Sequence, residues 1–152
     1  MAHVRVQFRD LIKTLITEIP DYCPVFVNRA DPLQENQDAP EVPCCLVLVT
    51  EDVIEIETMG MGGGRVANHN LTAQIDIVVK LGATFDDDLE AFALSAEKVM
   101  GTMAAFPGFK DVTAKGSSKG RPNGDGQSDL MMLRLTYGAL AQTPENDPET
   151  LI

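Results

Sequence analysis

The feature that most constrains the fold of this chain is a strict alternation of apolar and polar residues over residues 71–81. The odd positions are all apolar, and the even positions are polar except for Val78. Because successive side chains of a strand point to opposite faces, this pattern predicts a long strand with one buried and one mostly solvated face. Other elements of the chain must cover the buried face.

Two amphipathic helices are predicted to supply that cover. Over residues 4–19 the apolar residues recur at three- and four-residue steps, which is typical of a helix with one apolar stripe. Pro20 ends this helix, because the residue before a proline avoids helical backbone angles. A second stripe of this kind covers residues 89–103. It follows three aspartates at 86–88, which suit the positive pole and free amides of a helix start and are a weaker indication of a metal site.

Strands are predicted on the N-terminal side of the alternating segment as well. Residues 24–29 indicate a short strand, and the continuous apolar run at 44–50 is typical of a strand buried on both faces. Residues 53–57 alternate again, with isoleucines on one side and glutamates on the other. The Glu51-Asp52 pair between these two segments is predicted to be either a hairpin tip or a bulge.

The last two strands are predicted over residues 112–114 and 131–139. The order of elements predicts an α+β fold, in which two main helices pack on one face of a largely antiparallel or mixed sheet. We expect a single domain over residues 1–142. The acidic residues 143–152, which include two prolines, are predicted to be a flexible C-terminal tail.

Three segments lack hydrophobic periodicity and are predicted to be long, flexible loops, at residues 30–43, 59–65 and 116–128. The glycine-rich segment at 59–65 lies between two predicted strands, and no Lys-Ser or Lys-Thr follows it. A phosphate-binding loop instead needs the start of a helix. We therefore expect neither a nucleotide site nor another cofactor.

Composition narrows the class of protein. The 152 residues, of which 44% are hydrophobic, fit one domain. No apolar run approaches the ~20 residues of a membrane-spanning helix, and the N-terminus lacks the pattern of a signal peptide. The net charge of -11 argues against tight binding of nucleic acid, which needs clustered Lys and Arg. By itself the acidity indicates only good solubility.

The charge is distributed unevenly along the chain. Residues 30–57 contain eight carboxylates and no Lys or Arg, whereas residues 110–121 contain four cations and one carboxylate, Asp111. Opposite charges on two segments of one small chain indicate either pairing within the chain or head-to-tail contact between copies.

No pattern of catalytic or metal-binding residues is recognisable. The odd number of cysteines, Cys23, Cys44 and Cys45, argues against a disulfide framework and favours small buried side chains. His3 and His69 do not have the spacing of a zinc finger, so we expect no metal site. A Gly-x-Ser-x-Gly nucleophile motif is also missing from the sequence. These observations predict a binding or structural module without catalytic residues.

The order and the local sequence patterns of five segments resemble those of the bacteriophage tail terminator family, typified by the minor tail protein U of phage lambda. The resemblance covers most of the chain, roughly residues 4–141. The segments that carry it are a strand that ends in Arg29, a proline followed by an apolar strand, the alternating strand, the acidic helix start and the last strand. These segments lie at residues 25–29, 43–49, 71–79, 86–92 and 129–137.

The resemblance implies a structural virion protein without enzymatic activity. Proteins of this family form homohexameric rings that bind the last ring of the major tail tube protein and end its polymerisation. They also present a surface to the head-completion protein. Assembly in the host cytoplasm and a place at the head-proximal end of the tail, the neck, would follow. DNA would pass through the lumen without specific binding, and no membrane would be involved.

Two groups of residues are the candidate contacts in such a ring. The predicted subunit interface comprises Arg29, Asp31, Glu35, Asp38, Glu55, Glu57, Lys115, Lys119 and Arg121. The predicted partner-binding loops comprise Met59, Met61, Gly63, Arg65, Asn123 and Asp125. The alternatives are another ring protein of the phage neck, such as a head-completion protein, and a cellular binding module without enzymatic activity.

Overall fold

A computed structural model of the chain describes residues 2–27, 42–58, 64–121 and 129–152. Within them the chain forms two α-helices, a short 3-10 helix and one five-stranded sheet with the order β1-β2-β3-β5-β4. β1 is parallel to β2, and every other neighbouring pair is antiparallel. The elements are α1 (Val4–Thr17), β1 (Val25–Phe26), β2 (Cys44–Thr58), β3 (Arg65–Lys80), α2 (Phe85–Met100), η1 (Met103–Ala105), β4 (Phe109–Gly120) and β5 (Leu130–Pro144).

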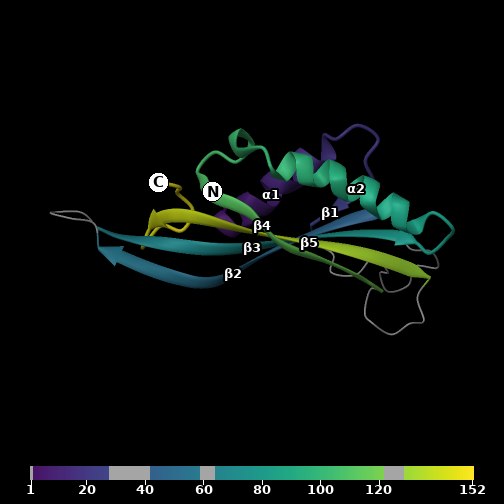
Figure 1. The fold of residues 1–152 in the computed structure, drawn as a ribbon. Coiled ribbons are helices and arrows are strands. Elements are labelled where there is room, and N and C mark those ends of the chain that lie inside the picture. The colour runs from purple at the N-terminus through teal and green to yellow at the C-terminus, as the bar shows by residue number, and fades with distance from the viewer. Residues whose placement is uncertain (1, 28–41, 59–63, 122–128) are drawn as a thin grey trace.

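Both helices lie on the same face of the sheet, so the predicted α+β fold is confirmed (Figure 1). The odd-numbered residues of β3 from Leu71 to Val79 are buried on this face, as their alternation predicted. α1 packs its stripe, which includes Phe8, Ile12 and Ile16, into the same core with no exposed surface. A fully buried side chain of this size contributes roughly 1.5–3 kcal/mol to stability. Among the described residues, no helix is both long and apolar enough to cross a membrane.

The ends of the helices follow from local capping. His3 caps α1, because its Nδ1 accepts a hydrogen bond from the backbone N–H of Arg5 at 3.1 Å. The helix ends at Thr17, ahead of Pro20 as expected. The three aspartates at 86–88 occupy the first turn of α2, but the N-cap residue is Thr84 and makes no side-chain cap bond. The aspartates therefore stabilise this helix through its dipole rather than as the N-cap residue.

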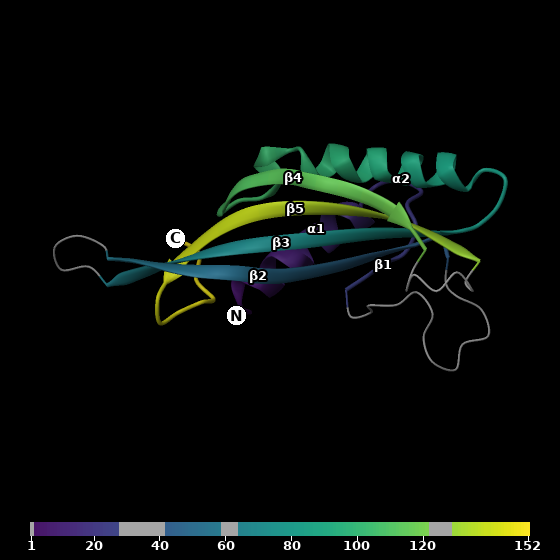
Figure 2. The same ribbon diagram turned by 60° about the horizontal axis from the view of Figure 1, so that its bottom comes forward.

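β2 and β3 form one long antiparallel hairpin whose far end extends past the helices (Figure 2). The two predicted strands at 44–50 and 53–57 are a single strand, and the pairing shifts between Glu51 and Ile54. The alternative of a bulge is thus confirmed, and that of a hairpin tip is wrong. Beyond the bulge, Ile54 and Ile56 are 51% and 43% exposed, because no helix covers them.

Two predicted boundaries of β1 and β2 need correction. β1 spans only Val25–Phe26, against the predicted 24–29, of which residues 28 and 29 lie outside the described part. In β2 only the first half of the apolar run is buried on both faces. Leu48 is 50% exposed, because β1 and its surroundings accompany the strand only at its start.

β4 is much longer than the predicted strand at 112–114. It spans Phe109–Gly120 and takes in the first part of the segment predicted to be a loop at 116–128. The backbone of β5 offers pairing partners along this whole length, so pairing overrides the low strand propensity of the glycines and lysines. Register shifts after Lys110 and after Ala114 show that the strand is bulged at two places.

The C-terminal residues fold back on the domain. β5 runs to Pro144, so the predicted boundary at residue 142 falls inside a strand. The backbone N–H of Val4 donates to the carbonyl of Pro148 at 3.0 Å, and that of Ile152 donates to Gln142 at 2.9 Å. Leu151 packs against the core. These contacts anchor residues that the sequence predicted to be a flexible tail.

Candidate functional site

The two edges of the sheet are the first candidate surface for contact with other proteins. β4 pairs with β5 on one side, and no described strand pairs with its other side. At the opposite edge, β1 pairs with β2 only through Val25 and Phe26, so the outer side of β2 beyond Leu46 has no strand beside it among the described residues. Open edges of this length offer backbone N–H and C=O groups to another chain.

The edges carry opposite charges. Glu55 and Glu57 are exposed on β2, in the half that extends past the helices. Lys110 and Lys115 are exposed on β4. In this conformation both side chains turn toward the neighbouring strand β5, where Lys110 donates to Oε1 of Gln142 at 2.8 Å and Lys115 lies over Gly138, so an edge contact requires them to turn outward. β3 and β5 lie between the two strands, so within one copy these glutamates and lysines belong to opposite edges of the sheet. This arrangement suits contact between neighbouring copies better than pairing within one chain.

Lys119, another predicted interface residue on β4, already has partners inside the chain. Its Nζ donates to Oδ1 of Asp86 at 2.8 Å and also forms an ion pair with Glu90. Hydrogen bonds to these two carboxylates raise the pKa of Lys119. It therefore ties β4 to the first turn of α2. Lys110 donates instead to a neutral group, Oε1 of Gln142, at 2.8 Å, so Lys119, whose partners are carboxylates, is the weaker candidate for a charged contact between copies.

The other predicted contact residues are less informative. Arg121 follows the end of β4 and is exposed. Arg65 begins β3, where its Nε pairs with Glu145 at 2.7 Å. The remaining predicted residues lie outside the described part of the chain; they are Arg29, Asp31, Glu35, Asp38, Met59, Met61, Gly63, Asn123 and Asp125.

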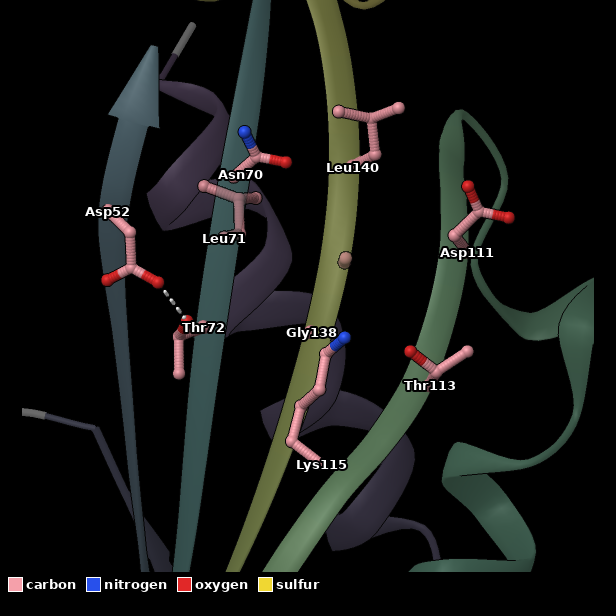
Figure 3. Close-up of a pocket in the computed structure, with 10 residues that line it drawn as sticks. Asp52, Asn70, Leu71, Thr72, Asp111, Thr113, Lys115, Gly138 and Leu140 are labelled. Atoms are coloured by element: carbon pink, nitrogen blue, oxygen red, sulfur yellow. Dashed lines mark hydrogen bonds between the residues drawn. The ribbon is translucent and has the colours of Figure 1, made fainter.

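A polar groove of about 300 Å³ crosses the face of the sheet that carries no helices (Figure 3). Asp52 stands at the bulge of β2 and accepts a hydrogen bond from Thr72 at 2.8 Å. Lys115 stands at a bulge of β4 and lies across Gly138 of β5, where an added Cβ would come 2.5 Å from the lysine Cε. The bulges thus aim one charge from each outer strand over the centre of the sheet, and the missing side chain at Gly138 makes room. The groove is a polar surface with charges of both signs.

A second cluster is buried where the start of α1 meets β2, β3 and β5. His69, which is 2% exposed, places Nδ1 against Oε1 of Glu51 and Nε2 2.8 Å from the hydroxyl of Thr143. Arg5 donates to the other oxygen of Glu51 at 3.1 Å. The ring of His3 stands edge-on to that of His69, with 5.5 Å between their centroids. Burial and the charge of Arg5 lower the pKa of His3, which favours its neutral form.

Carboxylate, imidazole and hydroxyl in this order resemble the groups that activate a nucleophile in hydrolases. The hydroxyl of Thr143 has no exposed surface, however, so a substrate could not reach it in this conformation. The three side chains instead connect β2, β3 and β5. Sequence reasoning missed the cluster, although His69 continues the series of odd, helix-facing positions of β3 toward its start.

The cysteines are free and buried, in agreement with the sequence-based interpretation. Burial raises the pKa of the Cys23 thiol to about 12 and that of Cys45 well above its ordinary value. Thiols of this kind are not nucleophiles near neutral pH.

Comparison with known proteins adds no relative from which a function could be transferred. No protein-family model matches the chain, and no curated protein has a significantly similar sequence.

Proposed function

We propose that this chain is a bacteriophage tail terminator whose copies close into a ring through the two edges of their sheets. The observation that carries the proposal is the pair of open edges with opposite charge, Glu55 and Glu57 on β2 and Lys110 and Lys115 on β4. A surface that is complementary to a different surface of the same molecule makes a heterologous contact. Such contacts close into a ring when the rotation between copies allows it.

In this ring the β4 edge of one copy lies beside the β2 edge of the next. Charge complementarity fixes which edges meet and disfavours the pairing of two β2 edges, whose glutamates would repel. The two kinds of contact reinforce each other, because backbone hydrogen bonds supply affinity and the charges supply specificity.

The ring would bind the last ring of the tail tube protein, stop its polymerisation and present its other side to the head-completion protein. This role needs surfaces and no chemistry. It would place the protein at the head-proximal end of the virion tail. With six copies the ring would carry 6 × -11 = -66 formal charges. Acidic groups along a lumen would let DNA slide without being held.

The proposed interface can be tested by exchanging its charges. The Glu55→Lys/Glu57→Lys variant and the Lys110→Glu/Lys115→Glu variant should each stay monomeric, because like charges then face each other across every contact. An equimolar mixture should form rings again, since each reversed edge now meets a complementary neighbour. Analytical ultracentrifugation or native mass spectrometry of the two variants and the mixture gives the result.

The control variant is Glu97→Lys, an exposed carboxylate that belongs to α2 and to neither edge strand. It should assemble as the unchanged chain does. Rings formed equally well by either charge-reversed variant alone would rule out the edge contact. Mass measurement with purified tail tubes then separates the possible roles, because a terminator adds to tube ends and a head-completion ring does not. A chain that stays monomeric with and without tubes would contradict the ring function itself.

A further inference from the structure

The chain contains only two histidines, and the fold brings both of them to one carboxylate. His3 lies at the start of α1, Glu51 in β2 immediately before the bulge, and His69 in β3. One potential ligand atom from each residue lies within 4.8 Å of the other two. The cap that His3 gives to α1 and the bonds of His69 to Glu51 and Thr143 account for each imidazole separately, but not for the convergence of both on one carboxylate.

We propose that His3, Glu51 and His69 bind a divalent first-row transition metal ion, with Zn²⁺ as the best-matched ion. Two imidazoles and one carboxylate form a recurrent protein ligand set for Zn²⁺ and Fe²⁺, with further positions left for water. Mg²⁺ and Ca²⁺ prefer shells made entirely of oxygen ligands, so this donor set discriminates against them.

The surroundings of the three residues orient their ligand atoms. The Thr143 hydroxyl, 2.8 Å from Nε2 of His69, can accept a hydrogen bond from that nitrogen. Nδ1 of His69 then presents its lone pair toward Oε1 of Glu51, and two facing acceptors are stabilised by a cation between them. Arg5 holds the other oxygen of Glu51 at 3.1 Å. Hydrogen bonds of this kind commonly position the ligands of bound metals.

Metal binding at this site requires a change of tautomer at both histidines. Without a metal ion, a proton on Nδ1 of His69 joins the ring to Glu51, and Thr143 donates to Nε2 instead. When an ion binds to Nδ1, the ring carries its proton on Nε2 and donates it to Thr143, so the neutral imidazole is kept and no proton is released. His3 must also release a bond, because its Nδ1 caps α1 at the N–H of Arg5. Its Nε2 can bind an ion only in the tautomer that gives up this cap.

The site meets solvent on the side of His3, which is partly exposed, and of Arg5, whose side chain is 47% exposed. The side chain of Glu51 is only 6% exposed and forms the closed inner side together with His69 and Thr143. A bound ion would cross-link the beginning of the chain to the hairpin of β2 and β3, next to the end of β5.

The test is titration of the full chain, after treatment with a chelator, with ZnCl₂ by isothermal calorimetry and with Co²⁺ by visible absorption. We expect one ion per chain, a Co²⁺ spectrum without sulfur-to-metal charge transfer, and a rise in Tm with Zn²⁺ but not with Mg²⁺. His3→Gln and Glu51→Gln should abolish saturable binding. Thr143→Val should weaken it by about 10- to 100-fold, since only the orientation of His69 is lost.

Asp52→Asn is the matched control, because this neighbouring carboxylate bonds Thr72 and lies outside the cluster. It should bind Zn²⁺ as the unchanged chain does. Circular dichroism without metal identifies any variant that fails to fold. His3→Gln changes a partly exposed residue at the start of α1, so its Zn²⁺ binding tests the proposal even if Glu51→Gln does not fold. Three results would each overturn the proposal. They are the absence of saturable Zn²⁺ binding, a thiolate signal in the Co²⁺ spectrum, and a Zn²⁺ affinity that is unchanged in both single variants, His3→Gln and Glu51→Gln.

Discussion

At the residue scale, the buried thiol of Cys23 gives the chain a pH dependence of defined sign. Burial raises the pKa of this thiol from 9.0 to about 12, so the folded state holds the proton more tightly than the unfolded state does. Its stabilising effect is complete below pH 9 and is lost as the pH rises toward 12. The free energy of unfolding should fall by about 1 kcal/mol between pH 8 and pH 10 from this group. Urea denaturation at the two pH values measures this change.

Cys23→Ala separates the thiol from other groups that titrate in this range, such as Tyr22, whose pKa is also raised by burial. The variant should be less stable at pH 8 and should lose part of the decline toward pH 10. An identical decline in the variant and the unchanged chain would show that Cys23 does not contribute.

The sequence predicted on which face of the sheet a side chain lies, but it did not predict the contacts that depend on strand register. The alternation over 71–81 identified the buried face of β3 correctly, because parity alone decides which side chains share a face. The same parity places His69 on that face. That Glu51 meets it depends on the bulge in β2, and that His3 meets both depends on where α1 begins. Neither is visible in the spacing of the three residues, so the sequence predicted no site here.

At the element scale, the far half of the β2–β3 hairpin is an arm with exposed isoleucines and no helix above them. Ile54 and Ile56 stay 51% and 43% exposed on the helix side of this arm, whose carboxylates face the other way. If the chain is a terminator, we expect this apolar surface to contact the tail tube or the head-completion protein. Ile54→Ser/Ile56→Ser should reduce capture of tail tubes in a pull-down while leaving stability within about 0.5 kcal/mol per site.

Leu94→Ser provides the comparison, because this leucine is equally exposed, at 54%, but belongs to α2. Tube capture should be unaffected by it. Undiminished capture by the isoleucine variant would exclude the arm as a partner contact. Loss of capture in both variants would point to a general effect of surface hydrophobicity.

Elements with a strong internal pattern were predictable, and those that depend on a neighbour were not. α1 and α2 follow their apolar stripes, since a helix satisfies its own backbone. β4 was predicted as three strand residues and a loop, because its lysines, serines and glycines carry little strand propensity. Pairing with β5 determines this strand, and a partner distant in sequence leaves no local signal.

At the scale of the whole molecule, the proposed ring sets two electrostatic effects of different range against each other. Each copy carries a net charge of -11, so neighbouring copies repel over long distances. The contacts between Glu55 or Glu57 and Lys110 or Lys115 would attract at short range. Salt screens the long-range repulsion between copies more readily than the short-range attraction at the edges, since the Debye length is about 10 Å at 0.1 M and about 3 Å at 1 M.

Ring assembly should therefore depend on salt in two phases. Adding salt to about 0.1–0.2 M should favour rings by screening the repulsion, and about 1 M salt should weaken them by screening the edge pairs. The charge-exchanged mixture is the matched comparison, because its two variants shift the net charge by equal and opposite amounts and leave the charge of a mixed ring unchanged. It should show the same two phases in sedimentation velocity. A ring population that only rises with salt would mean that the copies associate through apolar contacts, and the charged edges would then determine orientation alone.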